Sequence, residues 1–191
     1  MKQSDELVYS NDPCSAFIAA IVGSYESQIG SGHYLGRTAM QKLVYFARAV
    51  GVPIPCKFEI YTYGPYSETV TFAVDSLLAD DVIRDMSKDP RSYSDYRLGE
   101  NAQELLGAYG RLIEPSRTKI DAVVKNLGRF SPQILELVAT LHFAFHRLKG
   151  ICQRDPSKED VISEFQRVKK DKFAEAEISS WYEALRRASL I

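Results

Sequence analysis

The chain has 191 residues, of which 45% are hydrophobic and 26% charged, and its formal net charge is −1. This composition is typical of a globular protein with a substantial core, and it excludes a disordered chain. No stretch reaches the ~18 uncharged apolar residues of a membrane span, and the acidic start from Met1 to Glu6 lacks the apolar region of a secretory signal.

Apolar residues recur at helical spacing along most of the chain, which predicts a mainly helical protein. The first helix ends at Gly30 and the second before Gly51, Pro53 and Pro55. The spacing predicts helices over 15–29, 38–50, 67–79, 100–112, 117–127, 132–148, 158–168 and 174–188.

Three short segments carry strand patterns. Residues 58–62 alternate and are rich in aromatic and β-branched side chains, and residues 82–86 and 96–98 flank a polar tip as in a hairpin. We therefore expect one small antiparallel three-stranded sheet and no strand beyond residue 115. Gly64-Pro65 is expected to turn the chain from the first strand directly into the next helix.

One stretch carries a family signature. Residues 41–47 read QKLVYFA and residues 63–67 read YGPYS, and together they resemble the Panacea domain of SocA-like antitoxins and the YwgA-like uncharacterised bacterial proteins. The helix, hairpin and helix over 77–100 also resemble the end of a winged-helix domain. The resemblance covers roughly residues 36–110 and implies a helical bundle with a winged-helix-like core, which we place at residues 1–113. The remaining helices match no family, and we expect residues 114–191 to form a C-terminal helical region packed on that core.

The same resemblance implies a non-enzymatic protein of a bacterial or phage toxin–antitoxin system, which neutralises or adapts a protein partner. We expect its location to be cytoplasmic. A second copy of the chain is one candidate partner. The candidate partner-binding residues are Tyr61, Tyr63, Tyr66, Lys42 and Tyr45. Aromatic residues are enriched at protein interfaces, although the tyrosines at 61, 63 and 66 could equally wedge helices against the sheet.

A DNA-binding winged-helix regulator is the alternative function. Its reading helix would run from Ser67 to Ser76, but this segment has no Lys, Arg, Asn or Gln and carries Glu68 and Asp75. Phosphates would repel its carboxylates, and it lacks the Arg, Lys, Asn and Gln side chains that read base edges, so we expect weak DNA binding without sequence preference. The residues that could touch nucleic acid are Lys88, Arg91, Lys169 and Lys170.

The sequence predicts no catalytic residue, metal site or cofactor. His142 and His146 have the i, i+4 spacing of two metal ligands, but the only other histidine, His33, lies in a glycine-flanked loop. Phosphate-binding and nucleophile motifs are absent. The three cysteines, at positions 14, 56 and 152, are odd in number and widely spaced, so we expect partly buried free thiols in a reducing cytosol.

Overall fold

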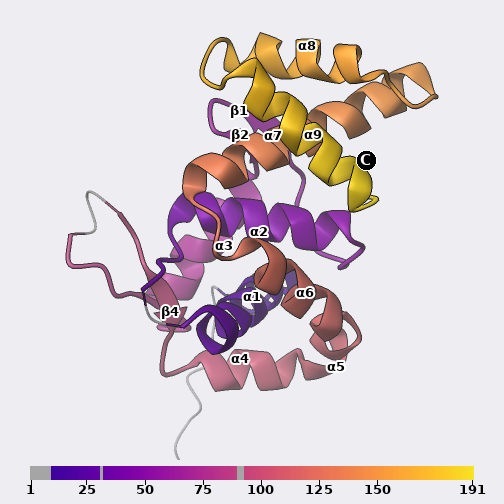
Figure 1. The fold of residues 1–191 in the computed structure, drawn as a ribbon. Coiled ribbons are helices and arrows are strands. Elements are labelled where there is room, and N and C mark those ends of the chain that lie inside the picture. Colours follow the sequence, from indigo (N-terminus) through magenta and orange to yellow (C-terminus); the bar gives the residue numbers. More distant parts are fainter. Residues whose placement is uncertain (1–9, 31, 90–92) are drawn as a thin grey trace, which may run out of the picture. The chain divides into compact units, whose positions relative to one another are not determined.

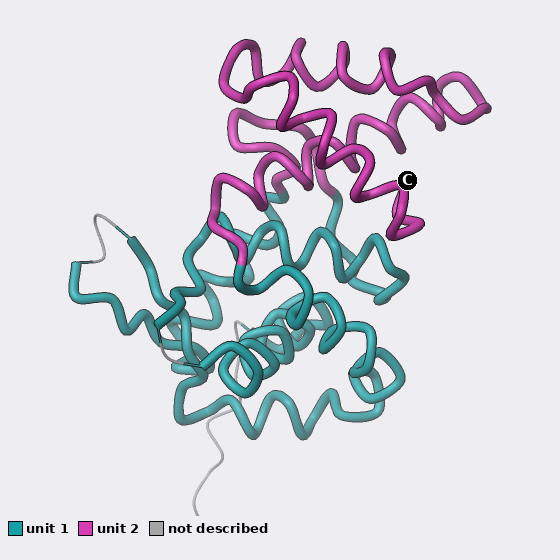
Figure 2. The backbone as a smooth tube through the Cα atoms, viewed as in Figure 1, with its two compact units in different colours: residues 1–57, 67–129 teal, residues 58–66, 130–191 magenta. Residues whose placement is uncertain are grey.

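The computed structural model describes residues 10–30, 32–89 and 93–191. Within these ranges the protein is mainly helical, with two antiparallel sheets of two strands each (Figure 1). The chain divides into two compact units, residues 1–57 with 67–129 and residues 58–66 with 130–191 (Figure 2). None of the described helices has the length and apolar character that a membrane crossing requires.

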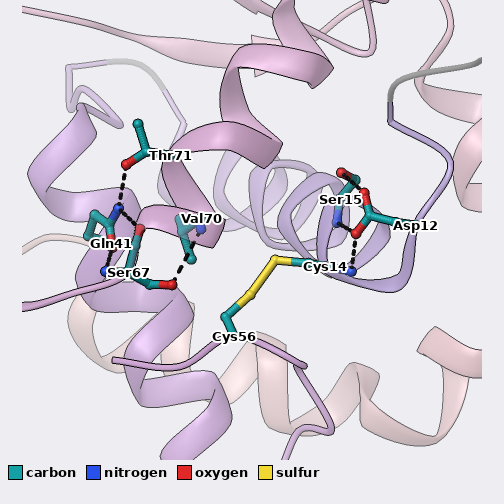
Figure 3. Close-up of a disulfide and its surroundings, with 8 residues drawn as sticks. All are labelled: Asp12, Cys14, Ser15, Gln41, Cys56, Ser67, Val70 and Thr71. Carbon is teal, nitrogen blue, oxygen red and sulfur yellow. Dashed lines mark hydrogen bonds between the residues drawn. A yellow bond between two sulfur atoms is a disulfide. The ribbon is translucent and has the colours of Figure 1, made fainter. Parts of the chain in front are cut away.

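The first unit is built around α1 (Pro13–Ile29). Every residue from Ala16 to Val22 is at most 2% exposed, and a helix that is apolar on all sides must be wrapped by other elements. Asp12 caps its N-terminus by accepting hydrogen bonds from the backbone N–H groups of Cys14 and Ser15 (Figure 3). The surrounding elements are α2 (Arg37–Ala49), α3 (Glu68–Ala79), α4 (Ala102–Ala108), α5 (Gly110–Ile113), α6 (Arg117–Leu127) and the strand β4 (Tyr96–Leu98).

One glutamine joins α2 to α3. The buried side-chain amide of Gln41 donates to the carbonyl oxygen of Ser67 at 3.0 Å and to the hydroxyl of Thr71 at 3.1 Å, and its oxygen accepts from the Ser67 N–H at 3.0 Å (Figure 3). Gln41 and Ser67 belong to the two halves of the sequence signature, QKLVYFA and YGPYS. The signature therefore corresponds to a physical contact that fixes the start of α3.

A hairpin follows α3. Strand β3 (Ile83–Asp85) pairs with β4 in antiparallel register, with Arg84 opposite Arg97. The Tyr96 N–H also donates to the carbonyl oxygen of Leu35 at 3.0 Å, so the segment before α2 touches the outer edge of β4. A Cβ atom at Gly99 would lie 2.1 Å from the Asp81 carbonyl oxygen, which leaves room only for glycine where the chain leaves the hairpin.

The second unit contains three helices and a hairpin. The helices are α7 (Pro132–Cys152), α8 (Lys158–Lys169) and α9 (Glu175–Arg187), and α7 contacts both of the others. Ser131 caps α7, and Ser157 forms a capping box with Asp160 at the start of α8. The hairpin strands are β1 (Glu59–Tyr61) and β2 (Gly64–Tyr66), and β2 lies against α7.

The expected three-stranded sheet is wrong. Residues 59–61 pair with residues 64–66 rather than with 83–85 or 96–98, so there are two separate two-stranded sheets. Pro65 therefore lies within β2 instead of at the helix entry, which is tolerated in a short strand with an open edge. The reversal is helped by Gly64, whose φ of +86° favours glycine. No strand occurs in residues 116–191, as expected.

Two other boundaries differ from the sequence prediction. The helix expected over 100–112 is interrupted at Tyr109 between α4 and α5. The expected division between residues 113 and 114 differs from the observed one, which falls after residue 129. The reason is that α6 packs against α1 and α2 and so belongs to the first unit.

The expectation of three free thiols is also wrong. Cys14 and Cys56 form a disulfide in the first unit, with their Cα atoms 6.7 Å apart (Figure 3). Both residues are at most 2% exposed, whereas Cys152 is a free, exposed cysteine. Wide spacing in sequence did not separate the pair in space, because the segment before β1 returns to the start of α1.

Reduction should destabilise the first unit. The bridge joins residues 42 positions apart, and closing such a loop restricts the unfolded chain by about 4 kcal/mol. We expect a reducing agent to lower the urea midpoint of the wild type and of the control Cys152→Ser, but not that of the double variant Cys14→Ser/Cys56→Ser. Three reactive thiols in the unreduced, unfolded protein would contradict the pairing.

Candidate functional site

The β1–β2 hairpin presents aromatic side chains to solvent. Its strands are joined by the two-residue turn Thr62-Tyr63, with Glu59 opposite Tyr66 and Tyr61 opposite Gly64. Tyr61 is 48% exposed and Tyr63 is 62% exposed. Tyr66 is half-buried, and its ring lies 5.1 Å from that of Tyr61 at a tilted angle. Three of the five predicted partner-binding residues therefore gather on this one hairpin.

A buried ion pair holds the turn of the hairpin in place. The Lys169 ammonium donates to the Thr62 carbonyl oxygen at 2.5 Å and to Glu136 Oε1 at 2.8 Å. The side chains of Lys169 and Glu136 are only 1% and 4% exposed. Lys172 also contacts both carboxylate oxygens of Glu136, at 2.7 and 2.9 Å. These bonds tie the turn of the hairpin to α7 and to the end of α8.

The electrostatics of this anchor explain its geometry. Burial lowers the pKa of Lys169, while the hydrogen bond and charge of Glu136 act in the opposite direction. A buried ammonium needs every available acceptor, and the Thr62 carbonyl supplies the one that Glu136 does not. Lys172 extends to the hairpin surface, where its Nζ lies 5.2 Å from the centre of the Tyr63 ring.

The other two predicted partner-binding residues lie in α2 of the first unit. Lys42 is 2% exposed and Tyr45 is 7% exposed. Burial raises the pKa of the Tyr45 phenol. In the structure both side chains contribute to an interior rather than to an exposed surface.

The predicted nucleic-acid contacts have different positions. Lys88 is exposed and its backbone N–H faces the Tyr93 hydroxyl at 3.4 Å, and Lys170 is exposed just after α8. Arg91 lies outside the described residues. The position of Lys169 differs from the prediction, because its buried ammonium binds Glu136 and Thr62 and is not available to a phosphate.

The two histidines of α7 lie together, with ring centres 4.3 Å apart. His142 is buried, and burial followed by the nearby His146 lowers its pKa to about 3, so it is neutral at physiological pH. His146 is exposed, and its Nε2 lies 2.9 Å from the Leu190 carbonyl oxygen. In the described ranges, no three His, Cys, Asp or Glu side chains are grouped so that they could hold a metal ion.

Sequence reasoning missed Glu136 and Lys172. The sequence does contain a signal for Glu136, since this residue stands between Leu135 and Leu137 in a predicted helix. In the structure both leucines are fully buried. A carboxylate at such a position requires a cation. Which lysine supplies it depends on the packing of α8 against α7, which the sequence does not specify.

Comparison with known proteins finds a relative of this chain. The sequence is 30% identical over 113 residues to an uncharacterised protein named YwgA from Bacillus subtilis (strain 168). The matched region covers 58% of this chain and 66% of that relative, just under two thirds of its length. No family model matches the chain.

Removing the Glu136 carboxylate should strongly destabilise the second unit. Glu136→Gln leaves Lys169 buried without its ionic partner, and breaking a buried pair in this way costs about 3–5 kcal/mol. We expect urea denaturation to report a loss of this size. The control Glu159→Gln, an exposed glutamate of α8, should cost less than about 1 kcal/mol.

A double variant separates the contribution of the ion pair to the free energy of unfolding from the contribution of general packing. Glu136→Leu combined with Lys169→Met replaces both charges with apolar groups and should recover much of the stability lost in Glu136→Gln. If the single variant unfolds no more readily than Glu159→Gln, the ion pair does not have the structural role assigned to it.

Proposed function

We propose that the protein is a non-enzymatic protein-binding module, antitoxin-like or accessory, that neutralises or adapts a partner protein in a bacterial or phage system. The β1–β2 hairpin is the proposed contact surface, and Tyr61 and Tyr63 are the residues proposed to contribute most to partner binding. The proposal includes no cofactor and no catalytic residue.

The observation that carries the proposal is a pair of exposed tyrosines on an anchored backbone. Large aromatic side chains contribute most to binding when they are already ordered before the partner arrives, because less conformational entropy is then lost. Tyr61 immediately precedes the Thr62-Tyr63 turn and Tyr63 lies within it, and Lys169 holds the carbonyl oxygen of Thr62. Tyr61 is 48% exposed and Tyr63 is 62% exposed, so about half of the first residue and more than half of the second are available to a partner.

Family resemblance supports the same function. The residues of the QKLVYFA and YGPYS segments resemble the Panacea domain of SocA-like antitoxins, and the chain is similar to YwgA, whose name assigns no activity. The contact between Gln41 and Ser67 gives these segments a shared structural role. The antitoxin role and the existence of a protein partner are both parts of the proposal.

The proposal also includes a winged-helix core formed by α1, the segment around Leu35, α2, α3 and the β3–β4 hairpin. Support comes from the order of these elements and from the hydrogen bond between the Tyr96 N–H and the Leu35 carbonyl. We propose a cytoplasmic location. Because the cytosol is reducing, this part of the proposal requires that the Cys14–Cys56 disulfide of the structure opens there to two buried thiols.

A winged-helix DNA-binding regulator is the alternative, and the order of elements favours it. The composition of α3 opposes it. The exposed residues of this helix include Glu68 and Asp75, and the helix contains no Lys, Arg, Asn or Gln. A helix of this composition has no cation to neutralise phosphates and none of the Lys, Arg, Asn or Gln side chains that make the specific paired contacts to base edges.

The first test is truncation of the exposed tyrosines. Cross-linked capture from the native host identifies the partner, and calorimetry then measures its affinity for the purified full chain. We expect the double variant Tyr61→Ala/Tyr63→Ala to weaken binding at least tenfold, because central aromatic anchors carry much of the binding energy. Its thermal midpoint should change by no more than about 3 °C.

The matched control is Tyr34→Ala, since Tyr34 is also 62% exposed but lies in the first unit. It should leave the affinity unchanged. A large fall in the thermal midpoint of the hairpin variant, with no change in affinity, would show that the tyrosines pack rather than bind.

DNA binding tests the alternative. We expect random and genomic duplexes to bind equally weakly at 150 mM salt, because residues 1–100 contain 9 basic and 13 acidic side chains. Any residual binding should fade steeply with salt, each neutralised phosphate adding about −0.9 to the log–log slope. Tight, sequence-selective binding at this salt concentration would favour the regulator.

A further inference from the structure

The outward face of α3 carries an exposed aromatic residue that the proposed function does not use. Phe72 is 67% exposed, the highest value among the exposed large hydrophobic side chains of the described residues. Glu68 lies four positions before it and Asp75 three positions after it, and both are exposed. Residues at these spacings are neighbours on a helix surface, so Phe72 lies between two carboxylates.

This exposure is not a sign of a loosely held helix. Val70, Val74 and Leu77 are at most 7% exposed on the opposite face. Gln41 binds the Ser67 backbone at the start of the helix, and the Ser67 hydroxyl accepts from the Val70 N–H. The helix is therefore fixed on one side while it presents a phenyl ring to water on the other.

The carboxylates beside Phe72 are also unlike those at the end of the helix. Asp80 accepts hydrogen bonds from the N–H and hydroxyl of Ser10, and Asp81 pairs with Arg84. Among the described residues, Glu68 and Asp75 form no ion pair. An apolar ring and two carboxylates without an ion-pair partner in the described ranges thus share one surface.

We propose that this face binds a basic amphipathic helix of a partner protein, an inference that rests on the proposed protein-binding function. Phe72 would pack against an apolar residue of that helix, while Glu68 and Asp75 would pair with two cations. The carboxylates are separated by seven residues, or about 10 Å along the helix axis. The partner segment would therefore carry Lys or Arg about seven residues apart, with an apolar residue between them.

Charge complementarity selects this occupant over the other candidates. An acidic segment or a phosphate backbone would be repelled by both carboxylates. A purely apolar segment would leave the two carboxylates partly desolvated without a cation. A basic helix satisfies the ring and both charges together.

A displayed peptide library tests the inference on the full chain. The library consists of 18-residue helical peptides in which the charged and apolar positions of one face are randomised. We expect selected peptides to have an apolar residue between Lys or Arg residues seven positions apart. Phe72→Ala should weaken their binding at least tenfold, Phe72→Leu should retain most of it, and Glu68→Lys/Asp75→Lys should shift the preference to acidic peptides.

The hairpin variant Tyr61→Ala/Tyr63→Ala distinguishes this inference from the proposed function. Peptides that lose binding only in the hairpin variant would overturn the α3 inference and leave the proposed function standing. Selected peptides without the basic pattern, or insensitive to Phe72→Ala, would also overturn the inference. Duplex DNA that competes with the peptides in wild type but not in Phe72→Ala would overturn both proposals in favour of the regulator.

Discussion

The buried contact between Glu136 and Lys169 is the interaction on which the aromatic hairpin depends. A two-stranded hairpin of three-residue strands is marginal by itself. The Lys169 ammonium binds the carboxylate and the Thr62 carbonyl at once, so part of the cost of burying the charge is offset only when the hairpin is in place. Formation of the ion pair and positioning of the tyrosines are therefore coupled.

The two units present surfaces with different chemistry. The hairpin of the second unit combines tyrosine rings with the ammonium of Lys172, 5.2 Å from the Tyr63 ring centre. The α3 face of the first unit combines Phe72 with carboxylates. Tyrosine tolerates both polar and apolar neighbours, whereas a phenyl ring between carboxylates is selective for a cationic, apolar surface. A single partner that used both would have to present two distinct chemical patches.

Helical periodicity predicted nearly every helix, because most of them have a buried stripe that repeats along the chain. It failed where local sequence is not decisive. Gly64-Pro65 suits a turn into a helix as well as a short strand, and only the return of residues 64–66 alongside 59–61 selects the strand. Lys169 reads as one member of an exposed basic run, and only contact with Glu136, 33 residues earlier, makes it a buried anchor. The Cys14–Cys56 pair likewise depends on a long-range return of the chain.

The hairpin occupies an interval of the chain between two segments of the first unit, and this order has a consequence for biosynthesis. Thr62 leaves the ribosome 107 residues before Lys169, which holds it. At about 5–20 residues per second, the hairpin waits roughly 5–20 s for its anchor. During translation the tyrosines are consequently present on an unanchored segment, whereas every residue of the first unit has been synthesised once residue 129 is added. A partner that recognised the nascent chain would encounter the α3 face before the finished hairpin.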